Sequence, residues 1–200
     1  MDYHIQTEPV CLPGSPDLVT SPVSRQRRGT RHEIRKKMEI PEDTKVVMIT
    51  MGGVPEHYPF LDQLTRHREI HFIIPGASRQ TRIEGNLRLL PNHSDFFHPD
   101  LVHASDAVIG KVGYSTLAEI YNAGVVFGYI PRRKFRESKV LVSFIETEMN
   151  GIPIDEKDFY NGRWLALLPD LLAFPRIQRQ GPNGAIQVAR FIRNLINSEA

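Results

Sequence analysis

From residue 41 onward, short apolar runs that end at glycine or proline recur along the chain. Such runs, bounded by turn residues, are typical of buried strands, and apolar residues at helical spacing lie between them. The runs predict strands at residues 45–51, 69–76, 86–91, 106–110 and 125–131. The helical spacing predicts helices at residues 58–68, 98–105, 114–124, 137–151, 159–173 and 183–198. The helix at 159–173 is expected at least as far as Pro169, and Asn183 is a good N-cap for the last helix.

This alternation predicts an α/β fold with a doubly wound, Rossmann-like parallel sheet and helices on both faces. In open sheets of this kind, ligands bind in the loops that follow the carboxyl ends of the strands. Four loops are therefore predicted to form the ligand site: Gly52-Gly53, Pro75-Gly76, 110–116 and 131–138.

The chain divides into three parts by composition. Residues 1–24 are rich in proline, lack periodicity and predict an irregular lead-in. Residues 25–40 form a basic linker and helix, and residues 41–200 form the main domain. The basic stretch 24–37 is interpreted either as a solvated linker with an exposed helix, or as a contact to anionic lipid headgroups or a sugar-lipid phosphate. Nucleic acid is a weaker hypothesis because no aromatic residue is interleaved for base stacking.

Composition narrows the class of protein. The chain has 200 residues, of which 40% are hydrophobic and 24% charged, with a formal net charge of +2. No apolar stretch reaches the roughly 18 to 20 residues of a membrane span, and the N-terminus has no signal-peptide pattern. Cys11 is the single cysteine, so no internal disulfide is possible. These features predict a cytoplasmic protein.

The turn after the fourth predicted strand is the first candidate for chemistry. Its order, Gly110-Lys111 and then Ser115-Thr116, does not fit a P-loop, and no GxGxxG motif is present. A helix N-terminus at this turn favours phosphate. Glu119 has two interpretations: it completes a capping box with Thr116, or its carboxylate binds the two hydroxyls of a ribose.

Other residues also have two interpretations each. Gly52-Gly53 allows close approach of a ligand or makes a tight turn. The 131–138 loop is a basic surface loop, or it binds a diphosphate through arginines and sugar hydroxyls through its acidic helix start. The residues concerned are Arg132, Arg133, Glu137 and Ser138.

Nothing in the sequence predicts a metal site or a cysteine nucleophile. His93, His98 and His103 are five residues apart, which is a poor spacing for metal ligands on a helix. Cys11 has no partner base nearby in the sequence.

The stretch HPDLVHASDAVIGKVGYSTLAEIYNAGVVFGYIPRRKFRES, residues 98–138, resembles the donor-binding, C-terminal half of MurG-like GT-B glycosyltransferases. It is more similar still to the glycosyltransferase-like N-terminal domain of plant L-arabinokinases and its stand-alone bacterial relatives. The resemblance extends over residues 25–196. It implies that residues 41–200 form a nucleotide-sugar-binding domain. It also implies glycosyl transfer from an NDP-sugar, most naturally a UDP-sugar, with inversion and without a metal or other cofactor.

The resemblance also implies roles for the candidate residues. It assigns Glu119 to the ribose, the loop around His93 to the uracil, and the loop at Gly52 and Gly53 to the phosphates and sugar. The diphosphate would lie over the turn, which consists of Gly113, Tyr114, Ser115 and Thr116, and Arg132 or Arg133 would stabilise it as it leaves. Glu137 and Ser138 would contact the donor sugar, although the family has a glutamine pair there.

The same resemblance leaves the acceptor side open. In the family an acceptor half precedes this domain and commonly supplies the general base, whereas here only the lead-in precedes residue 41. His57 is the best, although weak, candidate base. The expected partners are a nucleotide sugar, a separate acceptor-binding subunit and a lipid-linked acceptor or membrane surface, but no nucleic acid. The alternatives are a non-catalytic nucleotide-sugar-binding module and a truncated, inactive transferase fragment.

Overall fold

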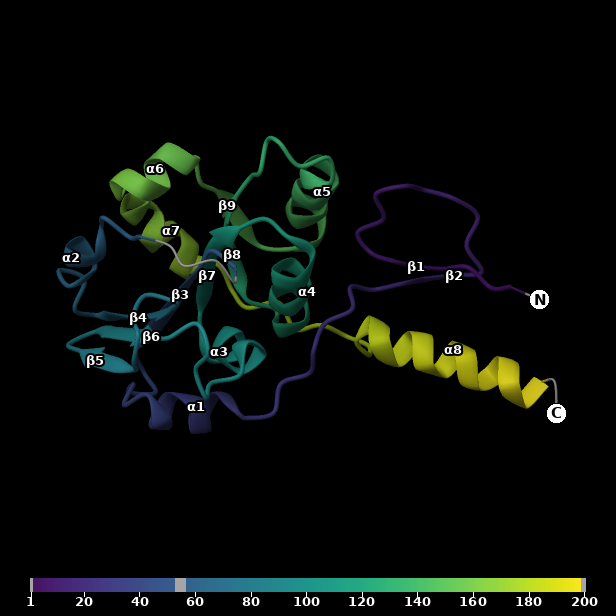
Figure 1. Cartoon of the computed structure of the whole chain (residues 1–200), viewed down its shortest axis with the longest axis horizontal. Helices are drawn as coiled ribbons and strands as arrows, with labels where there is room; N and C mark the ends of the chain where they lie inside the picture. Colours follow the sequence, from purple (N-terminus) through teal and green to yellow (C-terminus); the bar gives the residue numbers. More distant parts are fainter. Residues whose placement is uncertain (1, 53–56, 199–200) are drawn as a thin grey trace.

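The computed structural model describes residues 2–52 and 57–198. In this part of the chain, the main sheet has the strand order β5-β6-β4-β3-β7-β8-β9 (Figure 1). The bounds are β3 Lys45–Thr50, β4 Ile70–Pro75, β5 Arg82–Glu84, β6 Leu87–Leu90, β7 Ala107–Lys111, β8 Val126–Ile130 and β9 Gly151–Pro153. Neighbouring strands are parallel, apart from the antiparallel pair β5 and β6.

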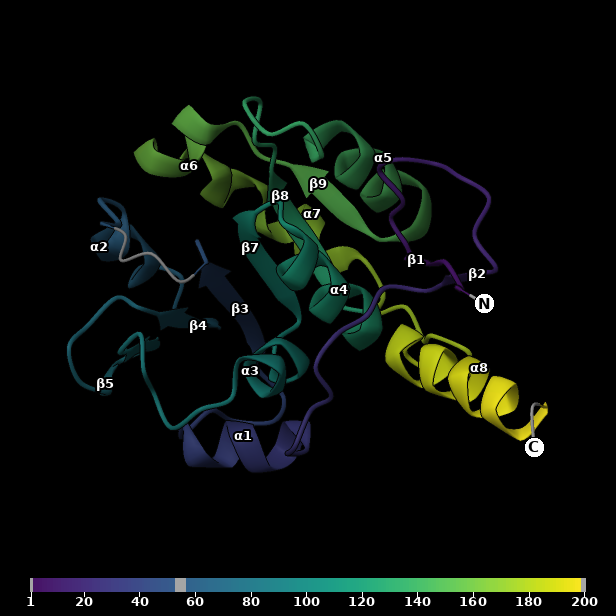
Figure 2. The same cartoon turned by 45° about the vertical axis from the view of Figure 1, so that its right-hand side comes forward.

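Helices cover both faces of this sheet (Figures 1 and 2). One layer consists of α1 Arg31–Lys37, α3 His98–Ala104, α4 Tyr114–Ala123 and α5 Ser138–Glu148. The other consists of α2 Leu61–Leu64, α6 Glu156–Asn161, the 3-10 helix Arg163–Leu167 and α7 Leu168–Ala173. Each layer has its own buried apolar cluster against the sheet. The predicted doubly wound α/β fold is therefore confirmed.

The predicted helix at 58–68 is much shorter in the structure, where α2 ends at Leu64. Asn86 lies directly before β6. Its side-chain amide donates to the carbonyl oxygens of Leu64, His67 and Ile70 at 2.9–3.0 Å. These carbonyls are therefore satisfied without a continuing helix. The residue that makes this contact is far away in sequence, so the helical pattern alone could not predict the early end.

The predicted helix at 159–173 is divided into α6, the 3-10 helix and α7. Gly162 ends α6 with φ +80°, and an added Cβ there would lie 2.6 Å from Oε1 of Gln63. Glycine is favoured in this left-handed conformation because it has no Cβ to clash. Pro169 lies in the first turn of α7, where its missing N–H costs no helical hydrogen bond. Pro169 therefore begins a helix rather than limiting one.

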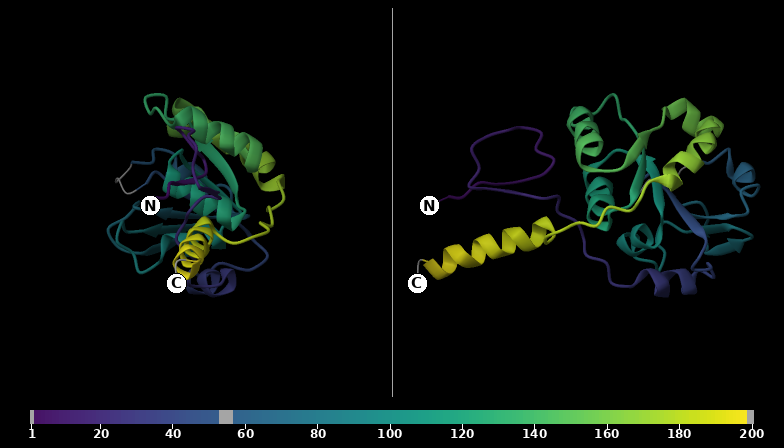
Figure 3. Two further views of the ribbon diagram at one scale, coloured as in Figure 1. Left: turned by 90° about the vertical axis from the view of Figure 1, so that its right-hand side faces the viewer. Right: turned by 180° about the vertical axis from the view of Figure 1, so that it is seen from behind.

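The lead-in is more regular than expected. It contains a parallel pair of short strands, β1 Ile5–Thr7 and β2 Leu18–Thr20. This segment runs beside α8 Gly184–Ser198, and both extend away from the main sheet (Figure 3). Asn183 joins them, because its Nδ2 donates to the Ser24 carbonyl at 2.9 Å while its Oδ1 accepts from the Ala185 N–H at 2.9 Å. The predicted N-cap at Asn183 is confirmed.

The basic stretch is bound into the fold through α1. Arg35 is fully buried and donates to the carbonyl oxygens of Ala104, Glu42 and Thr44 at 2.9–3.0 Å. Its guanidinium also pairs with Asp106 Oδ2 at 2.8 Å. The expectation of a solvated linker with an exposed helix holds for residues 25–28 and for the outer face of α1, whereas the inner face of α1 is buried at Ile34 and Arg35.

Asp106, at the amino edge of the sheet, pairs with the basic side chains of α1. Its carboxylate accepts from Arg31, Arg35 and the Val46 N–H, each at 2.8 Å. Burial raises the pKa of Asp106, but the hydrogen bonds from Arg31 and Val46 outweigh burial and hold that pKa below its usual value. The carboxylate therefore stays ionised and fixes α1 against β3 and β7.

No helix within residues 2–52 and 57–198 is long and apolar enough to cross a membrane.

We expect Arg35→Met to lower the free energy of unfolding by about 3–5 kcal/mol, because it removes one partner of a buried ion pair and leaves carbonyl groups unpaired. Chemical denaturation measures the change. Lys36→Met is the matched control, since Lys36 lies on the same helix but is exposed. An Arg35→Met variant as stable as the Lys36→Met variant would contradict the role given to Arg35.

Candidate functional site

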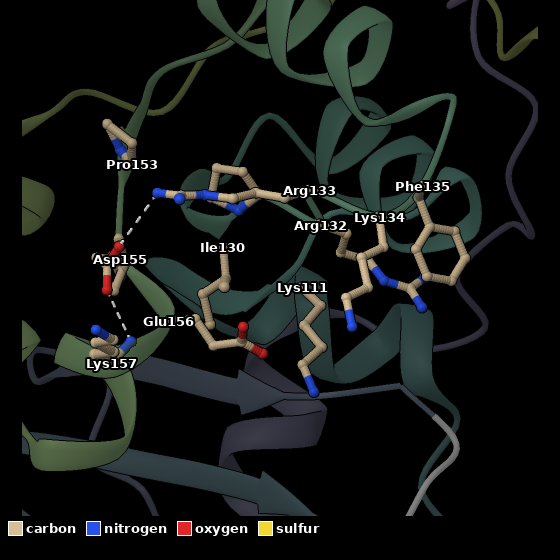
Figure 4. Close-up of a pocket in the computed structure, with 12 residues that line it drawn as sticks. Lys111, Ile130, Arg132, Arg133, Lys134, Phe135, Pro153, Asp155, Glu156 and Lys157 are labelled. Atoms are coloured by element: carbon tan, nitrogen blue, oxygen red, sulfur yellow. Dashed lines mark hydrogen bonds and ion pairs between the residues drawn. The ribbon is translucent and has the colours of Figure 1, made fainter.

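The carboxyl ends of β7, β8 and β9 meet at one edge of the sheet, where their register pairs Lys111 with Ile130 and Tyr129 with Pro153. A pocket of about 790 Å³ opens at this edge (Figure 4). It is lined by five cationic side chains, Lys111, Arg132, Arg133, Lys134 and Lys157, and by two acids, Asp155 and Glu156. The excess of positive charge suits an anionic ligand.

Neighbouring groups position the cations of this pocket. The Arg132 backbone N–H donates to Ser138 Oγ at 3.0 Å, and its guanidinium lies 3.2 Å from the centre of the Phe135 ring. Arg133 Nη2 lies 3.8 Å from Asp155 Oδ2, while Asp155 Oδ1 caps α6 (Figure 4). The side chain of Arg133 is 89% exposed, so it can turn toward a ligand at little cost.

Helix α4 begins directly after β7 at the same edge. Gly113 is its N-cap, and no described side chain caps it. Thr116 lies inside the first turn, and Glu119 lies further along the helix with its carboxylate directed at other elements. The interpretation of Thr116 and Glu119 as a capping box is therefore wrong. The first N–H groups of α4 carry partial positive charge and suit an anion.

Glu119 is buried and ionised at the centre of a small network. Its side chain is 4% exposed, and its Oε1 accepts from Arg25 Nε at 3.0 Å and Nη2 at 2.9 Å. Its Oε2 lies 2.6 Å from His98 Nδ1. Burial raises the pKa of Glu119, but the hydrogen bonds from His98 and Arg25 outweigh burial and lower that pKa below its usual value.

His98 extends this network to the end of β3. It is the first residue of α3, and its Nε2 lies 3.4 Å from Thr50 Oγ1. Thr50 is the last residue of β3, two positions before Gly52. Glu119 is therefore linked through His98 to the end of the strand that precedes Gly52.

Tyr114, at the start of α4, contacts the lead-in. Its hydroxyl donates to the Pro9 carbonyl at 2.7 Å and lies 2.9 Å from Cys11 Sγ. Burial and the Cys11 contact raise the pKa of Tyr114 well above its usual value, so the hydroxyl stays protonated. Further along the helix, Asn122 Nδ2 donates to the Pro22 carbonyl at 3.0 Å.

The structure brings together only some of the predicted site residues. Arg132 and Arg133 line the pocket, whereas neither Glu119 nor any residue of the Gly113–Thr116 turn does. Ser138 is buried with its Oγ on the Arg132 N–H, and Glu137 is exposed as the N-cap of α5.

The other predicted positions that the structure describes lie on the surface. Gly52 is exposed, with φ +84° after β3, and His93 is exposed in the segment after β6. Ser115 is exposed in the first turn of α4, and Gly53 lies outside the described residues. His57, the weak candidate base, is exposed.

Several residues at these sites were not predicted as site residues: Arg25 and His98 beside Glu119, and Lys111, Lys134, Asp155, Glu156 and Lys157 at the pocket. In the sequence, Arg25 is one of several cations in the basic stretch 24–37, and His98 stands out only as one of three evenly spaced histidines. Lys111 was considered only as part of a P-loop, whereas its Nζ lies 3.4 Å from Tyr160 Oη at the pocket. No local pattern reports these contacts, because the partners come together only in the fold.

The histidines of α3 have separate surroundings. His98 faces Glu119, whereas burial and then the nearby Arg176 lower the pKa of His103 to about 4. Among the described residues, no group of three or more His, Cys, Asp or Glu side chains is placed to hold a metal ion.

The chain was compared with known proteins by sequence and by fold. No protein-family model matches the chain. The chain is 28% identical over 183 residues to an L-arabinokinase of Arabidopsis thaliana. The aligned region covers 91% of this chain and 17% of that protein. The chain therefore spans about a sixth of this relative.

Solved glycosyltransferase structures are similar in fold. MurG of Acinetobacter baumannii has a TM-score of 0.58 at 16% identity, covering 95% of this chain and 59% of that one. The glycotransferase of kitacinnamycin has a TM-score of 0.55 at 15% identity, covering 79% and 42% respectively. The expected resemblance to L-arabinokinase and to the Rossmann-like half of GT-B glycosyltransferases is thus confirmed, and the chain spans about half of these structures.

The lowered pKa of Glu119 predicts how stability depends on pH. A carboxyl group whose pKa is lower in the folded than in the unfolded state stabilises the fold above its unfolded pKa, near 4.5. That stabilisation is lost as the pH falls through the folded pKa. We therefore expect wild type to exceed Glu119→Gln in free energy of unfolding at neutral pH, and the difference to shrink below pH 4.5.

Denaturant titrations across the acid range test this expectation. Glu148→Gln, on the exposed side of α5, is the control for loss of one negative charge. A difference between wild type and Glu119→Gln that stays constant with pH would show that the Glu119 carboxylate is not held as an ion.

Proposed function

We propose that this chain binds a nucleoside diphosphate sugar, in the first instance a UDP-sugar, as the donor-binding half of a GT-B-type glycosyltransferase. The observation that carries the proposal is the position of Glu119. It is a buried, ionised carboxylate on α4, and the N-terminus of α4, which no described side chain caps, lies at the carboxyl edge of the sheet. A carboxylate accepts hydrogen bonds from both hydroxyls of a ribose, while the helix N-terminus and nearby cations favour the attached phosphates.

Each part of the donor has a candidate partner. The diphosphate would lie between the N–H groups of the Gly113–Thr116 turn and the cationic pocket, with Arg132 or Arg133 approaching it. The base would meet the loop after β6, which includes His93, and the phosphates would approach the loop at Gly52. The donor sugar would meet Glu137 and Ser138 at the start of α5.

The proposed reaction is glycosyl transfer with inversion. An acceptor oxygen forms a bond to the anomeric carbon, and the bond from that carbon to the diphosphate oxygen breaks on the opposite face. The diphosphate leaves with the electron pair, and a base takes the proton of the acceptor hydroxyl. This chain's share is to hold the donor and to stabilise the leaving diphosphate with fixed dipoles and cations, so that we expect no metal ion to be required.

A nucleotide-sugar-binding module without transfer activity is the competing proposal. It needs the donor site but no general base, and His57, the candidate base among the described residues, is exposed rather than held beside Glu119. A separate acceptor-binding chain and a lipid-linked acceptor belong to the transferase proposal alone. Turnover of a bound donor in the presence of an acceptor-binding partner would distinguish the two.

Titration calorimetry with UDP, GDP, ADP and UDP-sugars tests donor binding. Wild type should bind UDP and UDP-sugars, and Glu119→Gln should lose about 1.5–3 kcal/mol of binding free energy, because an amide replaces a charged acceptor. Glu148→Gln should bind as wild type does. A chain that binds none of these nucleotides, or a Glu119→Gln variant with unchanged affinity, would refute the proposed site.

The proposed diphosphate contacts predict a second result. Arg133→Gln should weaken UDP binding about three- to tenfold, because a charge-assisted contact to phosphate is lost, and it should leave uridine binding unchanged. Arg136→Gln is the matched control, since Arg136 lies in the same loop but does not line the pocket. Equal effects of the two substitutions would show that the pocket does not receive the diphosphate.

A further inference from the structure

Residues 9–25 lie along one side of α4 and contact it at three positions. The Tyr114 hydroxyl contacts the Pro9 carbonyl and the Cys11 thiol. The Asn122 amide donates to the Pro22 carbonyl. The Glu119 carboxylate pairs with the Arg25 guanidinium. We call residues 9–25 the strap. Figure 2 shows the lead-in passing α4 and α3 before it enters α1. The strap thus contacts both the start of the helix and its buried carboxylate.

The strap leaves Glu119 with little capacity for another ligand. A carboxylate has about four acceptor positions, two on each oxygen. Arg25 uses both positions of Oε1, with its Nε at 3.0 Å and its Nη2 at 2.9 Å. His98 uses one position of Oε2 at 2.6 Å. One position remains, whereas the two hydroxyls of a ribose need two acceptors.

Arg25 is the partner that can leave. Its side chain is 59% exposed, and it projects from a segment without regular structure. His98 is only 27% exposed, belongs to α3 and is also near Thr50 on its other ring nitrogen. After leaving, Arg25 remains within reach of the Phe97 ring, whose centre lies 5.0 Å from its guanidinium carbon.

We propose that the strap is a gate on the nucleotide site, and that a ribose diol opens it by displacing Arg25 from Glu119 while His98 keeps the carboxylate in position. This inference rests on the proposed nucleotide site. Opening also frees Tyr114, so Pro9 and Cys11 move away from the N-terminus of α4, where the phosphates would bind. Nucleotide binding and the closed strap therefore exclude one another, and the fraction of closed chains lowers the apparent affinity.

Cys11 provides a direct readout, because it is the single cysteine of the chain and its thiol lies against Tyr114. The rate of its reaction with dithionitrobenzoate reports whether the strap is closed. We expect saturating UDP to raise this rate in wild type. Dideoxyuridine diphosphate, which lacks both ribose hydroxyls, and inorganic pyrophosphate should leave the rate unchanged.

Arg25→Gln tests the gate itself. It should bind UDP about three- to tenfold more tightly than wild type, because fewer chains are closed. Without nucleotide, its Cys11 should already react at the rate that UDP induces in wild type. Arg27→Gln is the control for loss of one positive charge, since Arg27 bonds only to the nearby Gly29 carbonyl in the described part of the chain. It should match wild type in both measurements.

The outcomes separate the gate from the site. If UDP binds wild type and Glu119→Gln weakens that binding, but Arg25→Gln binds UDP no more tightly than wild type does, the gate is wrong and the site stands. The same conclusion follows if UDP binds and the Cys11 rate does not change. If no nucleotide binds either wild type or Arg25→Gln, the proposed function is wrong and the gate falls with it.

Discussion

A buried charge must be paired, and this requirement joins parts of the chain that are far apart in sequence. At the carboxyl side of the sheet the charge is Glu119, which joins α4 to His98 on α3 and to Arg25 at the end of the strap. Through His98 the network reaches Thr50 at the end of β3. The arrangement of helices and lead-in around the candidate site therefore depends on one ionised carboxylate.

Asp106 has the same role at the opposite edge, but with a different result. There, Arg31, Arg35 and the Val46 N–H satisfy the carboxylate, and the buried Arg35 satisfies nearby carbonyl groups. That edge is closed and structural. The carboxyl edge has an open pocket rich in cations, and one partner of its buried carboxylate is largely exposed. The proposed ligand site therefore belongs to the carboxyl edge, which is where parallel sheets of this class bind ligands.

The sequence predicted the features that depend on neighbouring residues. The central strands and the helices α3, α4, α5 and α8 follow from apolar periodicity, and the N-cap at Asn183 follows from residue type. The strands β5 and β9 are too short to stand out. The early end of α2 depends on Asn86, which is distant in sequence, whereas the break at Gly162 follows from its left-handed C-cap, a local feature that the sequence analysis did not use.

For the candidate site too, the sequence predicted some residues but not their distant partners. Arg132 and Arg133 were expected at the edge where the pocket lies, because they follow a strand end. Glu119 was singled out, but its partners were not, since Arg25 is 94 residues away and His98 is 21 residues away. The helix start at Tyr114 was predicted, and it is this start that rules out the capping-box interpretation, because Thr116 then lies within the first turn.

A crystal structure of the chain with bound UDP would test the central claim most directly. The account predicts ribose hydroxyls on the Glu119 carboxylate, phosphates at the N-terminus of α4, His98 still on Glu119, and Arg25 displaced. A structure in which UDP binds elsewhere while Arg25 remains on Glu119 would contradict it.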